Sequence, residues 1–339
     1  HLLAREWPTE KESGLILHRI KCGGPSFLRM RSFARQAARL VREAGFDLVH
    51  SFERTYSQDI FRAGDGCHAE WLLRRARAQG RWRGRLDRVN PKHRAFLGLE
   101  ARLFSDPRLK LVLANSQRGR AEILQHYGWP ESRVRVLYNG LDHDRFHPGL
   151  AARYRQEVRA ELGLSQDEPA ALFVGSGFAR KGLGETIRAL KLAEVRLLVA
   201  GKDRAGPFRR LAAKMGVFHR VMFLGPRLDV ERLYGAADLF VLPSWYEPFS
   251  NACLEAAAAG LPLVTTKESG AAEIIQEGVN GYTVSFPTSA QELAEKINLA
   301  LTIDRSRLAA ANQTILASFT WENNLNQTLA AYQDILGRL

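Results

Sequence analysis

Cysteine is scarce in this chain: 339 residues contain three, at Cys22, Cys67 and Cys253, and none forms a CxxC pair. This spacing favours neither a disulfide framework nor a zinc site, and it fits a reducing cytosol. Long apolar runs are also missing, because none reaches the roughly 18 residues of a membrane-spanning helix. We therefore expect a cytoplasmic protein without a transmembrane helix, and no signal peptide.

Acidic residues are scarce in the first half only. Residues 1–150 carry 28 basic and 16 acidic residues, whereas the remainder carries 21 and 20. The densest basic run, Arg74 to Arg94, holds nine basic residues and one acid, Asp87. Such a face suits a phosphate-rich partner, which is a nucleic acid, an anionic lipid or a phosphorylated glycan. A solvated basic surface without a partner is the alternative.

The length allows two domains of roughly 150 residues each. In the second half, short apolar runs alternate with helical stretches, and they lie at 171–175, 196–201, 220–224, 238–242 and 261–265. This alternation predicts a parallel, doubly wound sheet. The first half shows the rhythm less regularly, with strands expected at 2–6, 15–20, 47–51, 110–114 and 133–138, and long helices at 27–44 and 91–104.

The predicted fold is therefore α/β, with two Rossmann-like parallel-sheet domains that face a cleft. The stretch 148–167 is rich in Pro, Gly and charge, so we place the interdomain link there. The domains are predicted at 1–150 and 151–318. A C-terminal amphipathic helix in 319–339 is expected to pack back toward the first domain.

Ligands of open parallel sheets bind beyond the carboxyl ends of the strands, so the loops there are the candidate sites. After the run ending at Val174 comes "GSGFARKG", from Gly175 to Gly182. Its glycines allow a close backbone approach, and Arg180 with Lys181 adds two charges just before a helix N-terminus. This combination suits a diphosphate. A tight turn with solvated cations is the alternative.

A second loop contains "WYEPFSNACLEAAAAGLPLV", from Trp245 to Val264. Ser250 or Asn251 can cap the helix that it predicts. Glu255 lies about one turn inside this helix, and Glu247 lies before it. Stabilisation by the helix dipole explains an acid at Glu255 but not at Glu247. The two carboxylates are good acceptors for hydroxyl groups at two separated points of one ligand.

"EPFSNACLEAAAAGLPLV", with its Glu-x7-Glu spacing, resembles the donor motif of retaining glycosyltransferases of the GT-B fold, family four (glycosyl transferases group 1). The segments "NGLDHDRF", "FVGSGFARKG", "LLVAGKD", "RVMFLG" and "YGAADLFVLPS" occur in the order of that family. The donor loops and "SFERTYSQDIFRAGDGCHAEWL" look like the lipopolysaccharide core glucosyltransferase I subgroup (WaaG type). The family's first strand and Gly-Gly loop have no counterpart, so the first domain is expected to lack its first strand and helix.

The resemblance implies a role for each matching residue. Glu247 would bind hydroxyls of the donor sugar, and Glu255 the ribose. Asp65 would act beside the acceptor hydroxyl, with His68 as a competitor for that role. The expected catalytic residues are Asp65, Glu247 and Lys181. The expected donor-binding residues are Gly175, Arg180, Lys181, Arg145, Lys202, Arg220, Val221, Glu247, Phe249, Ser250, Asn251 and Glu255, with Arg220 and Val221 beside the base. The expected membrane or acceptor residues are Trp71, Arg74, Arg75, Arg81, Trp82 and Arg83.

The function implied is a retaining, metal-independent hexosyltransferase that moves glucose from UDP-glucose to a heptose of the lipopolysaccharide core. The enzyme would need no cofactor and would lie peripherally on the inner membrane, bound to anionic lipid and not to nucleic acid. "DHD" at Asp142–Asp144 is similar to a metal-binding motif, but it falls in the family's Asn-Gly-x-Asp turn, so we expect no metal there. The alternatives are another lipid-linked or exopolysaccharide acceptor, a sugar-nucleotide epimerase of the same fold, and a basic nucleic-acid-binding protein.

Overall fold

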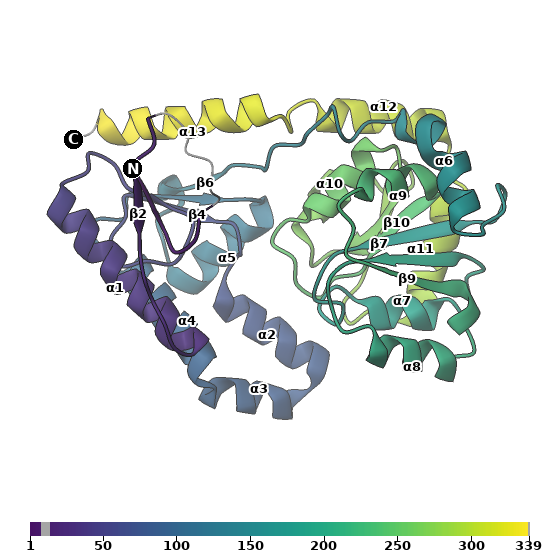
Figure 1. Ribbon diagram of the computed structural model, residues 1–339, viewed down its shortest axis with the longest axis horizontal. Coiled ribbons are helices and arrows are strands. Elements are labelled where there is room, and N and C mark those ends of the chain that lie inside the picture. Colours follow the sequence, from purple (N-terminus) through teal and green to yellow (C-terminus); the bar gives the residue numbers. More distant parts are fainter. Residues whose placement is uncertain (8–13, 338–339) are drawn as a thin grey trace. The chain divides into compact units, whose positions relative to one another are not determined.

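The computed structural model describes residues 1–7 and 14–337, without the side chains of Arg81 and Arg83. It divides into two compact units. One unit comprises His1–Leu137 and Gln327–Leu339, and the other comprises Tyr138–Asn326 (Figure 1). The division at Leu137 and Tyr138 lies earlier in the chain than the predicted 150/151. The last helix, α13 (Trp321–Leu336), begins in the second unit and ends in the first.

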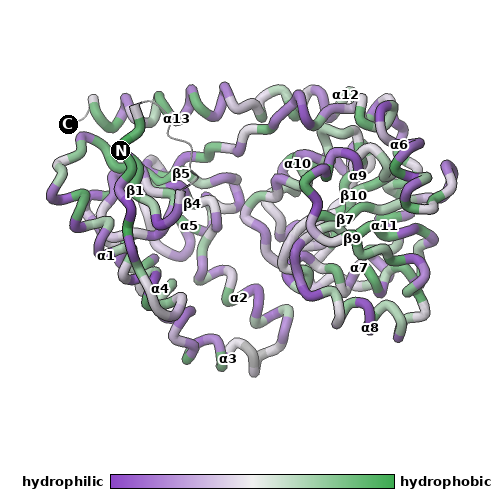
Figure 2. The backbone as a smooth tube through the Cα atoms, in the orientation of Figure 1, coloured by the Kyte–Doolittle hydropathy of each residue, from purple (hydrophilic) through white to green (hydrophobic). Residues whose placement is uncertain are grey.

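The second unit contains a six-stranded sheet in the order β12-β11-β10-β7-β8-β9, and every pair is parallel. The strands are β7 (Ala170–Val174), β8 (Arg196–Ala200), β9 (Val221–Gly225), β10 (Leu239–Leu242), β11 (Leu263–Thr266) and β12 (Gly281–Val284). The central strands are apolar along their whole length, as Figure 2 shows, because helices cover both faces of the sheet.

Helices pack on both faces of this sheet (Figure 1). One face carries α7 (Leu183–Ala189), α8 (Gly206–Lys214) and α11 (Ala290–Leu301). The other face carries α6 (Leu150–Glu161), α9 (Val230–Ala236), α10 (Asn251–Ala258) and α12 (Arg305–Leu316). The unit is therefore doubly wound, as the alternating pattern predicts.

The structure corrects the expected interdomain link at 148–167, because α6 occupies most of it and packs against α9. Leu150 and Val158 are buried on this helix. The fully buried Arg159 donates hydrogen bonds to the carbonyl oxygens of Ser165 and Ala236. A buried arginine that is satisfied by carbonyls looks polar in the sequence, which is why the helix was read as a linker.

The strand order places a topological switch point between β7 and β10. The chain passes outward from β7 through β8 to β9 and then returns to β10 on the other side of β7. The loops that follow β7 and β10 therefore diverge at the carboxyl edge of the sheet. This is where ligands of doubly wound sheets bind.

The first unit contains two parallel sheets. One pairs β1 (Leu2–Ala4) with β2 (Leu17–Arg19), and the other has the order β3-β4-β5-β6. These four strands are β3 (His50–Ser51), β4 (Ile60–Ala63), β5 (Leu111–Ala114) and β6 (Val134–Val136). Its helices are α1 (Ser26–Ala44), α2 (His68–Gln79), α3 (Arg81–Val89), α4 (Pro91–Phe104) and α5 (Gln117–Tyr127). A pocket of about 610 Å³ is lined by Leu2 and Leu3 of β1 and by Val49 and His50 at β3.

Strand β4 was absent from the sequence prediction. Its third residue, Arg62, is buried and donates a hydrogen bond to the carbonyl oxygen of Leu137, so a central strand carries a charge. Within residues 1–7 and 14–337, no helix combines the length and apolarity that a bilayer crossing requires.

Candidate active site

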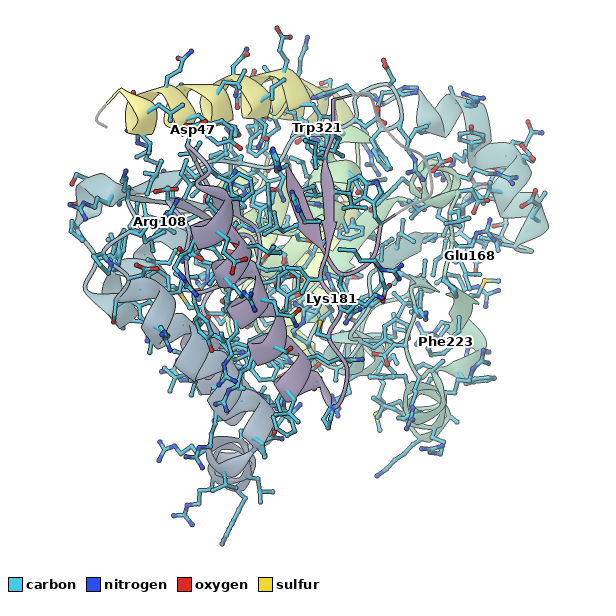
Figure 3. All side chains as sticks on the ribbon, turned by 60° about the vertical axis from the view of Figure 1, so that its left-hand side comes forward. Asp47, Arg108, Glu168, Lys181, Phe223 and Trp321 are labelled. Atoms are coloured by element: carbon cyan, nitrogen blue, oxygen red, sulfur yellow. The ribbon has the colours of Figure 1, made fainter. Side chains whose placement is uncertain are left out.

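Two cations and one carboxylate meet at the switch point of the second unit. Lys181 Nζ lies 2.9 Å from Glu247 Oε2, and Arg180 Nη1 lies 2.8 Å from the same oxygen. Arg180 also donates to the carbonyl oxygen of Tyr246 at 2.8 Å. The Lys181 and Glu247 side chains are only 11% and 12% exposed, whereas Arg180 is 29% exposed. The structure therefore brings together the loops after β7 and β10; Lys181 is labelled in Figure 3.

Two glycines shape the loop that carries these cations. Gly175 has φ +146°, and a Cβ added to it would lie 2.6 Å from Lys181 Cδ and 3.0 Å from Lys181 Nζ. Gly182 has φ +81°, and its Cβ would lie 2.2 Å from the carbonyl oxygen of Pro243. The bare backbone at Gly175 thus leaves the space through which Lys181 reaches Glu247.

Replacing Gly175 with alanine is expected to lower the sugar transfer that the motif resemblance implies about a hundredfold while every charge stays in the chain, because the new methyl group displaces the Lys181 ammonium group. Steady-state kinetics and a thermal melt measure the two effects. Gly163→Ala is the matched control, since Gly163 has φ +64° and an added Cβ would meet nothing within 4 Å. Equal activity of the two variants would show that the path of Lys181 over Gly175 does not matter.

Two residues that the sequence analysis passed over hold this loop in place. The indole N–H of Trp245 donates to the carbonyl oxygen of Ala179 at 3.1 Å. The backbone N–H of Trp245 donates to the carbonyl oxygen of Arg180 at 3.0 Å. Asp203 accepts a hydrogen bond from the amide of Phe178 at 2.7 Å. Asp203 belongs to the "GKD" segment, and it directly follows the predicted donor-binding residue Lys202. That position in the sequence could have marked Asp203 as part of the site.

The helix α10 begins at the same edge. Ser250 is its N-cap, and the serine hydroxyl accepts from the amide of Cys253 at 3.3 Å. Asn251 accepts from the side chain of Asn139 at 2.7 Å, so the "NGLDHDRF" segment reaches the start of α10. Phe249 is buried and stacks on Phe319, with ring centroids 6.0 Å apart. The side chains of this segment fix the backbone, whose amides point out of the helix N-terminus.

Glu255 has a different environment from Glu247. Tyr234, which is fully buried, donates to Glu255 Oε2 at 2.9 Å. Burial raises the pKa of Glu255, although the Tyr234 hydrogen bond and the charges of Arg145 and Lys181 oppose the rise. Tyr234 lies in the "YGAADLF" segment, and no role for it was predicted from the sequence. One carboxylate is therefore held by two cations and the other by a phenol.

The remaining predicted donor residues divide into two groups. Lys202 follows β8 at the same sheet edge as Gly175, and its amide donates to the hydroxyl of Ser176 at 3.2 Å. Arg145 pairs with Glu231 at 2.7 Å and donates to the carbonyl oxygen of Leu228 at 2.6 Å. The side chain of Arg145 is 42% exposed, and its charge reaches Glu255.

Arg220 and Val221 are not brought to this edge. They lie at the amino end of β9, where Val221 is level with Leu197 at the start of β8. Arg220 donates to the carbonyl oxygens of Ala193 and Leu190. The expected place of these residues beside the base is corrected accordingly, because parallel strands put the start of β9 at the opposite edge from the end of β7.

Asp65 lies in the first unit, in the Gly-Asp-Gly turn after β4. Its side chain is 82% exposed and lies 3.9 Å from Nη1 of Arg54. Arg54 is buried, and it anchors the turn by donating to the carbonyl oxygen of Gly66 and by pairing with Glu100 at 2.8 Å. The turn is rigidly held while the Asp65 carboxylate faces solvent, which suits a group that meets a substrate.

His68 has a different setting, although it lies three residues from Asp65. Its ring stacks on Phe96 and Trp71, with centroids 4.6 and 5.3 Å apart. Burial lowers the pKa of His68 to about 3, and His93 and Arg54 add to the effect. The imidazole is therefore neutral near pH 7 and packs as an aromatic ring.

The expected membrane or acceptor residues of α2 and α3 have different environments. Arg74 pairs with Glu70, and Arg75 pairs with Asp87 at 3.2 Å and lies 4.9 Å from the ring centroid of Trp71. The Arg75–Asp87 pair therefore joins α2 to α3, whereas the other two contacts lie within α2. Trp82 is 78% exposed. The side chains of Arg81 and Arg83 fall outside the described structure. No group of three or more metal-ligating side chains gathers in the described residues.

Comparison with known proteins assigns the family. Residues 154–316 match the family described as Glycosyl transferases group 1, and residues 1–145 match Glycosyltransferase Family 4. Lipopolysaccharide glucosyltransferase WaaG of Escherichia coli K12 is 31% identical over 277 residues, which are 80% of this chain and 72% of WaaG. The chain belongs to the group 1 glycosyltransferases. The resemblance drawn from the sequence motifs is thereby confirmed.

Two other glycosyltransferases match a smaller share of this chain than WaaG does. D-inositol 3-phosphate glycosyltransferase of Mycobacterium tuberculosis is 34% identical over 241 residues, and the match covers 67% of this chain and 49% of that relative. The glycosyltransferase MJ1607 of Methanocaldococcus jannaschii is 32% identical over 240 residues, or 61% of its own length. The chain thus spans about half to three quarters of these relatives.

Solved structures of glycosyltransferases confirm the fold. A crystal structure of WaaG, a glycosyltransferase involved in lipopolysaccharide biosynthesis, aligns with a TM-score of 0.80 and 26% identity, over 98% of this chain and 90% of that one. HepE of Anabaena in complex with UDP-glucose aligns with a TM-score of 0.70 and 22% identity, over 94% and 86%. The chain therefore has the α/β fold of GT-B glycosyltransferases, with parallel sheets in two domains.

Proposed function

We propose that this glycosyltransferase moves glucose from UDP-glucose, with retention of configuration and without a metal, to a heptose of a lipopolysaccharide core. The observation that carries the proposal is the convergence of Arg180 and Lys181 on Glu247, beside the N-terminus of α10. The family match, the WaaG relative and the likeness to a structure that holds UDP-glucose support the choice of donor and acceptor.

The cluster suits the departure of a diphosphate. As the bond between sugar and phosphate breaks, negative charge accumulates on the leaving oxygen, and Lys181 with Arg180 would stabilise that charge. Preorganised cations and helix amides stabilise a developing charge most when they need no rearrangement. Glu247 supplies this order, because both cations already bind its Oε2.

The remaining groups would bind and orient the substrates. Arg180 and Lys181 both pair with Oε2 of Glu247, and Oε1 would accept a hydrogen bond from a donor-sugar hydroxyl. Glu255, held by Tyr234, would accept from the ribose hydroxyls. The sugar is already activated by its diphosphate, so no protein nucleophile is required. The departing phosphate would take the proton of the acceptor hydroxyl, and Asp65 would orient that acceptor.

A panel of nucleotide sugars tests the proposal. The protein is incubated with UDP-glucose, UDP-galactose and GDP-mannose, with and without heptose-terminated truncated lipopolysaccharide, and the released nucleotide is measured. We expect release of UDP from UDP-glucose that depends on the lipopolysaccharide, together with an α-linked product. Release from GDP-mannose alone, or an epimerised sugar nucleotide with no transfer, would overturn it.

The surface of helix α3 supports the proposal that the protein binds to an anionic membrane. Trp82, Leu86 and Val89 are 78%, 61% and 69% exposed. Their spacing of four and three residues puts them on one face of the helix. Arg85 lies 5.0 Å from the ring centroid of Trp82, and the helix also carries Arg81, Arg83 and Arg88. An exposed apolar face among arginines suits the interface of a bilayer that contains acidic lipids.

Flotation with vesicles of phosphatidylglycerol and phosphatidylcholine measures this association. We expect the double variant Trp82→Ala/Leu86→Ala to lower the bound fraction at least about fivefold, because two apolar side chains no longer leave water. Leu228→Ala is the control, since Leu228 is a 96% exposed leucine in the other unit. Equal flotation of the native chain and the double variant would contradict a membrane role for α3.

A further inference from the structure

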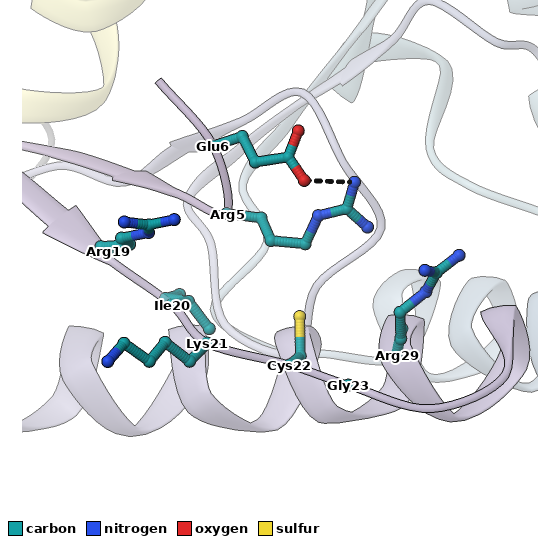
Figure 4. Close-up of a pocket in the computed structure, with 8 residues that line it drawn as sticks. All are labelled: Arg5, Glu6, Arg19, Ile20, Lys21, Cys22, Gly23 and Arg29. Carbon is teal, nitrogen blue, oxygen red and sulfur yellow. Dashed lines mark ion pairs between the residues drawn. The ribbon is translucent and has the colours of Figure 1, made fainter. Parts of the chain in front are cut away.

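The first unit contains a small pocket whose residues have no role in the proposed transfer reaction. It has a volume of about 390 Å³ (Figure 4). Arg5 and Glu6 follow β1, Lys21 and Cys22 follow β2, and Arg29 lies in the first turns of α1. Because β1 and β2 are parallel, their carboxyl ends form one edge, and ligands of parallel strands bind at such an edge.

The pocket is strongly basic. Among the residues that the structure describes, its lining contains the four cations Arg5, Arg19, Lys21 and Arg29 and one acid, Glu6. Glu6 pairs with Arg5 at 3.2 Å, as the dashed line in Figure 4 shows, and both side chains are exposed. Within residues 1–7 and 14–337, no ion pair is formed by the other three cations. Three positive charges around one concavity repel one another, and an anion between them would remove that cost.

The start of α1 adds to the imbalance. The first turn of this helix contains no acidic residue, and Pro25 at its N-cap offers no side-chain hydrogen bond. Arg29 places a cation close to the positive end of the helix dipole, where an acid is the stabilising choice. The charges of the pocket are therefore unfavourable for the isolated unit and favourable for a unit that binds an anion.

The lining also restricts the class of anion. No aromatic side chain is among the described residues that line the pocket, so this lining offers no stacking surface for a nucleobase. Ile20 and Cys22 are its apolar residues, which is too little for an acyl chain. Arginine and lysine together suit a phosphate monoester, a compact dianion with three oxygen acceptors.

We propose that this pocket binds a phosphate monoester on the acceptor glycan and so selects phosphorylated acceptors. The inference rests on the proposed function, because it names the acceptor class of that reaction. Arg19, Lys21 and Arg29 would each donate to phosphate oxygens, and Arg5 would join them when it exchanges Glu6 for the ligand.

Titration calorimetry at fixed ionic strength tests the binding, with mannose 6-phosphate and mannose as probes. We expect mannose 6-phosphate to bind and mannose not to bind. The variant Lys21→Gln/Arg29→Gln should weaken binding about tenfold or more, since two charge-assisted hydrogen bonds are lost. The control Arg31→Gln/Arg35→Gln removes the same charge from exposed positions of the same helix and should change affinity less than about twofold. Equal loss in both variants, or equal binding of mannose, would overturn the proposal.

Two further measurements separate this inference from the proposed function. With truncated lipopolysaccharide as acceptor, Lys21→Gln/Arg29→Gln should raise the KM for the phosphorylated form and leave that for the phosphatase-treated form unchanged. Transfer that is indifferent to acceptor phosphate would overturn this inference alone. Absence of UDP binding by the native chain would overturn the proposed function while leaving binding of mannose 6-phosphate intact. If the variant lost binding only to vesicles that contain phosphatidic acid, the ligand of the pocket would be a lipid headgroup. That result would also overturn the inference.

Discussion

Replacing Lys181 with alanine is expected to lower kcat for sugar transfer about a thousandfold, because the proposed mechanism loses the ammonium group that would stabilise the leaving diphosphate. The Lys181 side chain is 11% exposed and ends 2.9 Å from Glu247. Arg180 keeps its own bond to Glu247 at 2.8 Å, so the carboxylate is not left unpaired and the unit should stay folded. Steady-state kinetics with UDP-glucose and a circular dichroism melt measure both effects.

Lys191→Ala is the control for this variant, since Lys191 is an exposed lysine at the other end of α7. It removes the same charge from the same unit and should leave transfer within about twofold of the native value, because solvent screens exposed charges. Near-normal sugar transfer by Lys181→Ala would show that the cluster of Arg180, Lys181 and Glu247 does not act in the mechanism as proposed.

Replacing Glu247 with glutamine is expected to lower kcat about a hundredfold. The neutral amide can no longer order Arg180 and Lys181 around one oxygen, and both cations contribute through their position. The proposed hydrogen bond from the donor-sugar hydroxyl would also weaken, because an amide oxygen is a weaker acceptor than a carboxylate oxygen. The side chain keeps its size, so packing against the backbone of the Trp245 loop is preserved. The assay is single-turnover transfer at saturating UDP-glucose.

Glu255→Gln serves as the matched comparison for Glu247→Gln. Glu255 is assigned to the ribose, which keeps its contacts in the ground state and the transition state alike. Its loss should therefore raise the KM for UDP-glucose about tenfold and change kcat less than about twofold. If the two variants showed the same pattern, the two carboxylates would not have the separate roles assigned to them.

The sequence predicted the second unit well because its strands are short, apolar and fully buried. The run "AALFV" at Ala170–Val174, for example, is followed by the glycine-rich turn Gly175–Gly182, and this combination favours a buried strand. It failed where charge is buried. Arg159 on α6 and Arg62 on β4 donate to backbone carbonyl oxygens, whereas in the sequence alone a charged residue argues against a buried segment. Such pairings are tertiary, so no local pattern announces them.

The candidate site shows the same limit. The motif predicted that Arg180, Lys181, Glu247 and Glu255 belong to one site, since each lies in a loop or helix start beside a strand end. That the cations bind Glu247 itself depends on a contact across 67 positions of the chain, which the sequence does not specify. The same holds for Tyr234 against Glu255 and for Trp245 against the Arg180 loop. Arg220 was misplaced because a motif match ignores at which end of a strand a residue lies.

The central claim is that Lys181 recognises the diphosphate of the donor, and one calorimetric comparison tests it most directly. The affinities of UDP and of uridine are measured for the native chain and for Lys181→Ala. We predict that the native chain binds UDP at least about a hundredfold more tightly than uridine, because charge-assisted bonds form only with the diphosphate. In Lys181→Ala this ratio should fall about tenfold or more, with the affinity for uridine unchanged. An unchanged ratio, or a loss of affinity that is equal for UDP and uridine, would contradict the account.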